Sequence, residues 1–202
     1  SKKAQNIHRT LWMQDTKTLE DALNTSNALI KAEIESIAQT NARIADLGCG
    51  VGASLFYIYP RLQQPSPVLG LTLSPVQARL AQESAKQLGL QDHIRFAEGD
   101  FTSVPLPSES LDAVYSVEAV CHAVDPEKYF KEAGRLLRKG GKLILVDDYQ
   151  AARPFSANES KWLKAYIDGW YVPGVRTIEQ VISFASKNGL QLKKNEELTS
   201  HL

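Results

Sequence analysis

The chain has 202 residues, which suits one α/β domain with a full hydrophobic core. Its 23 lysines and arginines equal its 23 aspartates and glutamates. The chain therefore lacks the basic surplus that would indicate nucleic acid or an anionic membrane as a partner. The two cysteines form no metal-spaced cluster and no disulfide framework, so we expect no metal and, by default, a reducing compartment such as the cytoplasm.

No apolar run reaches transmembrane length, and the first residues lack a signal core, although a targeting segment could have been removed. Residues 1–40 are predicted to form a helical segment, because apolar residues from Leu19 to Ile37 recur at helical spacing. His8 and Trp12 precede that run. This segment either packs on one edge of the core or acts as a lid over a ligand.

Residues 42–150 alternate between apolar strand segments and helical segments. Strands are expected at 42–47, 68–73, 93–97, 111–117 and 142–146. Helices are expected at about 53–59, at 74–88 with Ser74 as N-cap, and from Asp125 to the Gly140-Gly141 pair. This alternation predicts an α/β fold with a doubly wound, mostly parallel Rossmann-like sheet and right-handed crossovers.

The rest of the chain belongs to the same single domain, 1–202. Residues 151–176 are predicted to be a helical insertion whose aromatic residues are more typical of a core than of a binding surface. Residues 177–202 should supply a last helix, capped by Thr177 and ended by Asn188-Gly189, and then a sixth strand from Leu190 to Leu198.

A glycine-rich loop follows the first strand and is the strongest candidate for a ligand site. Gly48-x-Gly50-x-x-Ala53 satisfies the dinucleotide fingerprint, and a following helix start favours a nucleotide-type ligand. Two features disfavour NAD. Asp46 would repel a pyrophosphate, and Thr72 stands where an acid that binds the ribose is expected.

A cationic adenosine ligand without phosphate fits these residues better, and S-adenosylmethionine is such a ligand. Asp46 could serve its positive charges. Asp100 follows the third strand, where it could accept a hydrogen bond from an adenine amino group, and Phe101 could pack on the ring. The alternative for Asp100 is a turn residue after Gly99.

Several blocks, in order, resemble the motifs of class I S-adenosylmethionine-dependent methyltransferases: Asp46 to Gly52, Gly99 to Phe101, Leu111 to Ser116 and Leu136 to Leu143. The resemblance runs from Arg43 to Val146. It implies S-adenosylmethionine as cofactor, S-adenosylhomocysteine as product, and cofactor contacts from Asp46, Gly48, Cys49, Gly50, Thr72, Leu73, Gln77, Gly99, Asp100, Phe101 and Ser116. That fold usually ends in a sixth strand and an antiparallel seventh strand, and no residues are left here for the seventh.

The block from Gly70 to Gln77 resembles the tocopherol and cyclopropane-fatty-acid branch, in which a hydroxyl and a glutamine replace the ribose carboxylate. The block from Ser116 to Ala123 resembles sterol C-methyltransferases. Glu118 and His122 are four residues apart, so in a helical turn they would share one face over the cleft. Either could act as a base, or Glu118 could stabilise a carbocation. Both could instead be ordinary loop residues.

These resemblances imply methyl transfer to a small, lipophilic acceptor of the sterol, prenyl, quinol or phenol type. The charge balance and the lack of a long apolar run predict no nucleic-acid partner and no integral membrane segment. A small amine such as a glycine derivative is the alternative acceptor. Two other classes remain open. One is a catalytically silent methyltransferase-like subunit, which the intact loop disfavours, and the other is an NAD-dependent oxidoreductase, which Asp46 and Thr72 disfavour.

Overall fold

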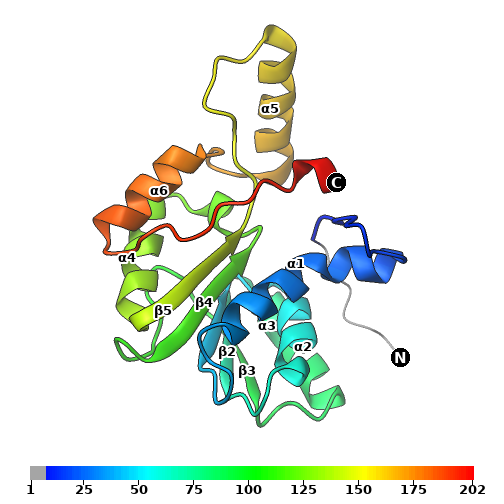
Figure 1. Ribbon diagram of the computed structural model, residues 1–202, viewed down its shortest axis with the longest axis vertical. Helices are drawn as coiled ribbons and strands as arrows, with labels where there is room; N and C mark the ends of the chain where they lie inside the picture. The colour runs from blue at the N-terminus through cyan, green and yellow to red at the C-terminus, as the bar shows by residue number, and fades with distance from the viewer. Residues whose placement is uncertain (1–7) are drawn as a thin grey trace.

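A five-stranded parallel sheet forms the centre of the protein, and the computed structural model describes residues 8–202 (Figure 1). The strand order is β3-β2-β1-β4-β5. The bounds are β1 Ile44–Leu47, β2 Val68–Thr72, β3 Ile94–Glu98, β4 Leu111–Val117 and β5 Leu137–Val146. The order reverses between β1 and β4, and ligands of open α/β sheets bind beyond the carboxyl ends of the strands at such a point.

Helices cover both faces of this sheet. Helices α1, α2 and α3 lie on one face, and α4 and α6 lie on the other (Figure 1). Their bounds are α1 Leu19–Glu35, α2 Ala53–Ile58, α3 Pro75–Gln87, α4 Pro126–Leu136, α5 Ala157–Trp170 and α6 Ile178–Lys187, with short 3-10 turns η1 Tyr59–Arg61, η2 Val120–His122 and η3 Thr199–His201. The predicted doubly wound α/β fold is confirmed.

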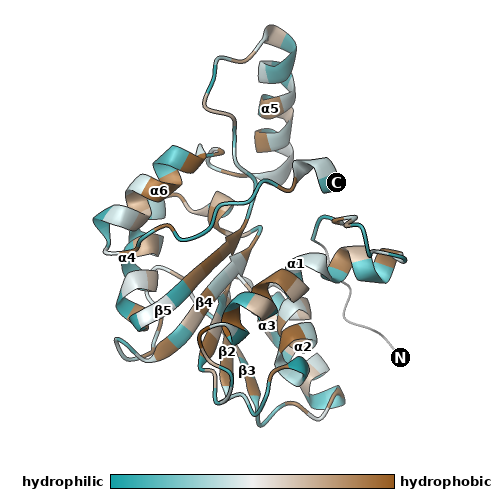
Figure 2. Cartoon of the chain, in the orientation of Figure 1, coloured by the Kyte–Doolittle hydropathy of each residue, from teal (hydrophilic) through white to brown (hydrophobic). Residues whose placement is uncertain are grey.

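Alternating residues of the central strands supply two hydrophobic cores. Ile44 and Tyr115 belong to the core beneath α1 to α3, whereas Ala45 and Val114 belong to the core beneath α4. This division follows from the two-residue period of a strand. Both β1 and β4 are buried along their whole length. Figure 2 shows the apolar residues at the end of β5 in brown.

The predicted helix starts are confirmed at Ser74, Asp125 and Thr177. Each side chain accepts a hydrogen bond from the backbone N–H three residues further on. Such caps satisfy donors that the first helical turn leaves unpaired. Gly89 ends the α3 segment with a φ of 71°, a left-handed conformation that favours glycine.

The N-terminal helix is shorter than the predicted 1–40. It begins at Leu19, because Thr18 and Asp21 form a capping box, and it ends at Glu35. Residues 8–18 form an irregular arm outside the helix, with a turn at Gln14 and Asp15, and residues 1–7 lie outside the described part of the chain.

Helix α4 also ends earlier than predicted, at Leu136 rather than at Gly140-Gly141. Leu137 is already extended and pairs with Leu111, and the register then shifts so that Lys142 pairs with Ala113. Pairing with β4 therefore overrides the helical pattern, and the two glycines lie in the irregular part of β5.

The predicted sixth strand is wrong. Residues 190–198 have no strand structure, so β5 is the edge of the sheet in the part of the chain described. A cavity of about 1240 Å³ is lined by β5 on one side and by residues 188–199 on the other. The backbone of this segment therefore does not form a ladder with β5.

The aromatic residues of the insertion are not core residues, contrary to the prediction. Helix α5 stands away from the sheet and has no buried residue (Figure 1). The exposed fractions of Trp162 and Trp170 are 70% and 62%. No helix among residues 8–202 combines the length and hydrophobicity needed to cross a membrane.

Candidate cofactor and acceptor site

The glycine loop follows β1 and takes three left-handed positions, at Gly48, Gly50 and Gly52. The N–H groups of Gly48 and Cys49 both donate to the carbonyl of Leu71, at 2.8 and 2.9 Å, so these two amides serve the fold rather than a ligand. A β carbon at Gly48 would lie 2.4 Å from that of Ala119. At Gly50 it would meet nothing within 4 Å. The loop is therefore open at Gly50 and closed at Gly48.

Asp46 lies near the end of β1, one residue before this loop, and only 2% of its surface is exposed. Burial raises the pKa of its carboxyl to about 7, against a smaller opposing effect of Tyr115. Burial, and then the charge of Asp46, also raise the pKa of the Cys49 thiol. The buried hydroxyl of Tyr115 makes no hydrogen bond of ordinary geometry within the described part of the chain. This pair thus has unused hydrogen-bonding capacity beside the loop.

Thr72 and Gln77 meet at the end of β2, the strand next to β1. The Thr72 hydroxyl donates to Oε1 of Gln77 at 2.8 Å and accepts from the N–H of Ser74. Leu73 lies beside them with 65% of its surface exposed. The structure therefore brings together the hydroxyl and amide that were expected near a ribose.

Gly99, Asp100 and Phe101 follow β3, the next strand outward. The N–H of Gly99 donates to the carbonyl of Thr72 at 2.9 Å, which ties the two strand ends together. Asp100 is exposed, and its Oδ1 accepts from the N–H of Thr102 at 2.8 Å, as the turn interpretation requires. The ring of Phe101 packs edge-on against Tyr129. The ends of β1, β2 and β3 thus present the expected residues in sequence along one edge.

Ser116 has a different environment from the other predicted cofactor residues. It is fully buried, its hydroxyl donates to the carbonyl of Leu47 at 2.6 Å, and it shares a 2.7 Å hydrogen bond with the hydroxyl of Tyr129. These contacts join β4 to β1 and to α4. The structure gives Ser116 a role in holding the sheet together.

Glu118 and His122 do not share one helical face, contrary to the prediction. Glu118 directly follows β4 with a φ of 47°, and the short η2 turn begins only at Val120. Glu118 is half-buried, and its Oε1 accepts from the backbone N–H of Arg9 at 2.8 Å. His122 is exposed. A 3-10 turn places residues three apart in line, so the four-residue spacing does not align these two side chains.

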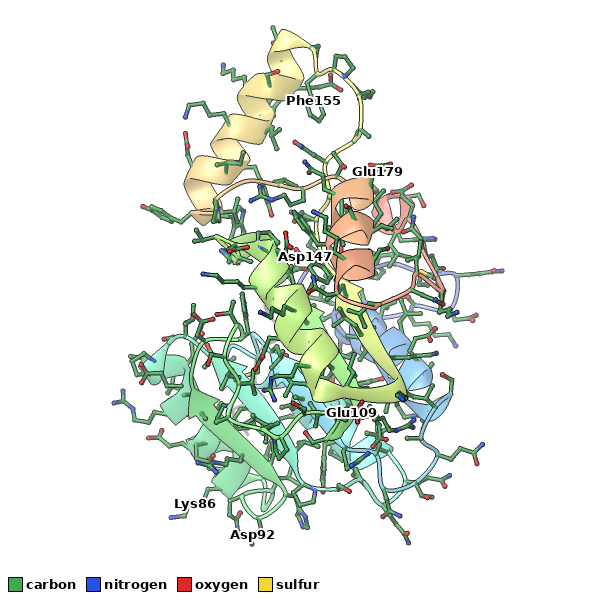
Figure 3. All side chains as sticks on the ribbon, turned by 90° about the vertical axis from the view of Figure 1, so that its left-hand side faces the viewer. Lys86, Asp92, Glu109, Asp147, Phe155 and Glu179 are labelled. Carbon is green, nitrogen blue, oxygen red and sulfur yellow. The ribbon has the colours of Figure 1, made fainter. Side chains whose placement is uncertain are left out.

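Two further carboxylates lie near Glu118, at the end of β5. Asp147 accepts from the backbone N–H of Cys121, and Asp148 is paired with Arg9 at 2.8 Å (Figure 3 labels Asp147). Burial raises the pKa of Glu118 and of Asp147, and the charges of Asp148 and Asp147 contribute to the rise at Glu118. Asp147 and Asp148 both directly follow β5 in the sequence.

Arg9 and Tyr166 complete this region and were not identified from the sequence. The guanidinium of Arg9 lies 5.9 Å from the ring centre of Tyr166, and the Tyr166 hydroxyl donates to Oδ2 of Asp148 at 2.7 Å. Neither residue belongs to a motif. They come from segments 157 positions apart (166 − 9) and meet only through the tertiary fold.

The residues at the glycine loop fit a cationic cofactor that lacks phosphate. The open space at Gly50 leaves room for a ligand to approach the loop. Asp46 would supply negative charge beneath it. Thr72 with Gln77 would supply uncharged polar groups further along the edge. A phosphate would gain nothing from a buried carboxylate.

Comparison with known proteins identifies the family of this chain. Residues 45–145 match the family model described as "Methyltransferase domain". The chain is 29% identical over 164 residues to 24-methylenesterol C-methyltransferase 2 of Oryza sativa subsp. japonica, covering 80% of this chain and 44% of that protein. It is 30% identical over 135 residues to the probable chloroplastic tocopherol O-methyltransferase of the same plant, covering 64% and 37%. The chain spans less than half the length of these relatives.

Among solved structures, the geranyl diphosphate C-methyltransferase of Streptomyces coelicolor A3(2), in complex with Mg2+, geranyl diphosphate and S-adenosyl-L-homocysteine, superposes with a TM-score of 0.80 at 20% identity. The alignment covers 96% of this chain and 74% of that one. At this identity the likeness concerns the fold alone. The family match spans half of the sequence and includes the glycine loop, β2, β3 and β4, so the chain belongs to the methyltransferase domain family.

Proposed function

We propose that this protein transfers a methyl group from S-adenosylmethionine to a small, lipophilic acceptor. The observation that carries the proposal is the buried Asp46 carboxyl beside a glycine loop that is open at Gly50. A buried carboxyl without a cationic partner is costly, and a positively charged cofactor would make its ionised form favourable. Membership of the methyltransferase domain family supports the same conclusion.

The chain's own residues would hold the two reactants in place. When bound, S-adenosylmethionine supplies an electrophilic methyl group on its sulfonium. Asp46 would attract the positive end of the cofactor, Thr72 and Gln77 would bind its ribose, and Asp100 and Phe101 would bind its adenine. Much of the catalysis would then come from placing the acceptor in line with the methyl group.

Glu118 would act on the acceptor side. It lies at the end of β4, next to β1 and its glycine loop in the sheet. The raised pKa of its carboxyl suits a base that takes a proton from an oxygen or nitrogen acceptor. In its ionised form it would instead stabilise positive charge that develops on a carbon acceptor. His122 is exposed and has the weaker structural support.

The acceptor class rests on the relatives. Their names describe methylation of a sterol and of tocopherol, and a structural neighbour was solved with geranyl diphosphate. All three molecules carry long hydrocarbon parts. A lipophilic acceptor is therefore the best-supported choice for this chain.

A small amine is the second candidate, and one observation favours it. Glu118, Asp147 and Asp148 gather at the ends of β4 and β5, and only Arg9 among the described residues is shown paired with this group. Like-charged carboxylates at one place favour a cation. An ammonium acceptor would supply that charge.

The decisive experiment has two parts. Calorimetry should first show binding of S-adenosylhomocysteine to the intact protein. A screen with methyl-labelled S-adenosylmethionine should then show transfer to sterols, quinols, tocopherol-like phenols or prenyl compounds, with small amines as the comparison set. Binding without transfer to any acceptor would favour a catalytically silent subunit. Absence of both would exclude the proposed enzyme.

A cytoplasmic location stays a prediction.

A further inference from the structure

The N-terminal arm crosses the carboxyl-end edge of the sheet and is attached on both sides of the point where the strand order reverses. Nε2 of His8 lies 3.0 Å from the hydroxyl of Ser54, in the second position of α2 after the glycine loop. The next residue, Arg9, contacts Glu118 and Asp148 at the ends of β4 and β5. Two adjacent residues thus connect the cofactor side with the acceptor side.

Asp148 is the point at which three segments meet. Its Oδ2 accepts from Nη2 of Arg9 at 2.8 Å, from Nε of Arg9 at 3.3 Å and from the hydroxyl of Tyr166 at 2.7 Å. The arm, the end of β5 and helix α5 are therefore joined through one carboxylate oxygen. Charge-assisted bonds of this kind are stronger and more directional than neutral ones.

Arg9 also holds the Glu118 side chain, through the backbone N–H of Arg9. The N–H of Arg9 donates to Oε1 of Glu118 at 2.8 Å, while the Arg9 side chain is held by Asp148. The position of the amide thus depends on the side-chain pair. Glu118 itself has a left-handed backbone, with a φ of 47°, which is uncommon for a residue with a β carbon.

We propose that Arg9 is a positioning residue, which orients the Glu118 carboxylate toward the acceptor through the clasp formed by Arg9, Asp148 and Tyr166. The orientation toward an acceptor rests on the proposed function, whereas the clasp rests on the contacts alone. One oxygen of Glu118 accepts from the Arg9 amide. The other has no hydrogen-bond partner among residues 8–202 and would face the acceptor. Release of the clasp would let the carboxylate rotate and the arm detach.

A first test measures the arm. Trypsin cleaves after Arg9, and mass spectrometry of the intact protein gives the cleavage rate. D148N should raise this rate about threefold, because a neutral amide holds the guanidinium less well. The matched control is D168N, which breaks the Lys164–Asp168 pair, also 2.8 Å long, within α5. Equal rates for wild type, D148N and D168N would overturn the clasp.

A second test measures Glu118 itself. Carbon-13 NMR of labelled glutamate, assigned with E118Q, follows the titration of this carboxyl. R9A should raise its pKa by about half a unit, because a neighbouring positive charge and a fixed N–H donor are weakened. R9K should restore most of the value, and K164A should leave it unchanged. An unchanged Glu118 titration in folded R9A would overturn the positioning role.

These outcomes are separable from the proposed function. Wild-type protein that fails to bind S-adenosylhomocysteine would refute the methyltransferase proposal and leave the trypsin and NMR results valid. Conversely, normal binding of S-adenosylhomocysteine with no response in D148N and R9A would refute the clasp alone.

Discussion

Asp46 and Tyr115 occupy neighbouring positions across the parallel pair of β1 and β4, and both side chains are buried. Burial and the charge of Asp46 raise the pKa of the Tyr115 phenol, so it stays neutral. The Asp46 carboxyl has a pKa of about 7 and is therefore the group of this pair that changes charge near neutral pH. We therefore expect stability and cofactor binding to depend on pH in opposite directions.

The substitution D46N should stabilise the protein more at pH 8 than at pH 5. A carboxyl whose pKa is raised in the folded state binds more protons there, so stability decreases as pH rises from about 4 to about 7. An amide has no such cost. The difference in the gain between the two pH values should be at most about 3 kcal/mol. Urea unfolding at both pH values measures it, and an equal gain at both would contradict the buried ionisation.

Affinity for S-adenosylhomocysteine should increase as pH rises through about 7, because the ammonium of the ligand favours the ionised form of Asp46. Calorimetry between pH 5.5 and 8.5 tests this. D46N should bind more weakly and show a flat profile across that range. A wild-type profile as flat as that of D46N would show that Asp46 does not face the cofactor.

Replacement of two loop glycines by alanine should have different effects. G48A places a β carbon 2.4 Å from Ala119, so it should destabilise the protein strongly. G50A meets no neighbour within 4 Å and should cost only about 1–2 kcal/mol, for its left-handed backbone. Thermal unfolding compares the two. Since a side chain at position 50 would project into the open part of the loop, G50A should also weaken cofactor binding while the protein remains folded.

The substitution S116A distinguishes a structural role from direct cofactor contact. It removes the hydrogen bonds to the Leu47 carbonyl and the Tyr129 hydroxyl and should cost about 1–3 kcal/mol of stability. Affinity of the folded variant for S-adenosylhomocysteine should stay within about twofold of wild type, as expected without direct contact. A tenfold loss of affinity with unchanged stability would instead support the cofactor contact inferred from the family resemblance.

Local patterns in the sequence predicted most of the elements correctly. The caps at Ser74, Asp125 and Thr177 depend only on a side chain and the backbone three residues away, so they can be recognised without the fold. The end of α4 could not be predicted in this way, because pairing of Leu137 with Leu111 overrides a helical pattern. The missing sixth strand and the exposed α5 have the same explanation, because both depend on whether the segment packs against or pairs with a neighbouring element in the fold.

The parallel α/β fold, the glycine loop with Asp46, and the residues at the ends of β2 and β3 can all be predicted from local sequence patterns. Each lies within a short stretch whose periodicity or turn chemistry is local. Three relationships required the folded structure: Ser116 is internal, Glu118 and His122 do not share a face, and Arg9 joins Glu118 and Asp148. These relationships depend on burial and on contacts between distant segments, which composition and spacing do not encode.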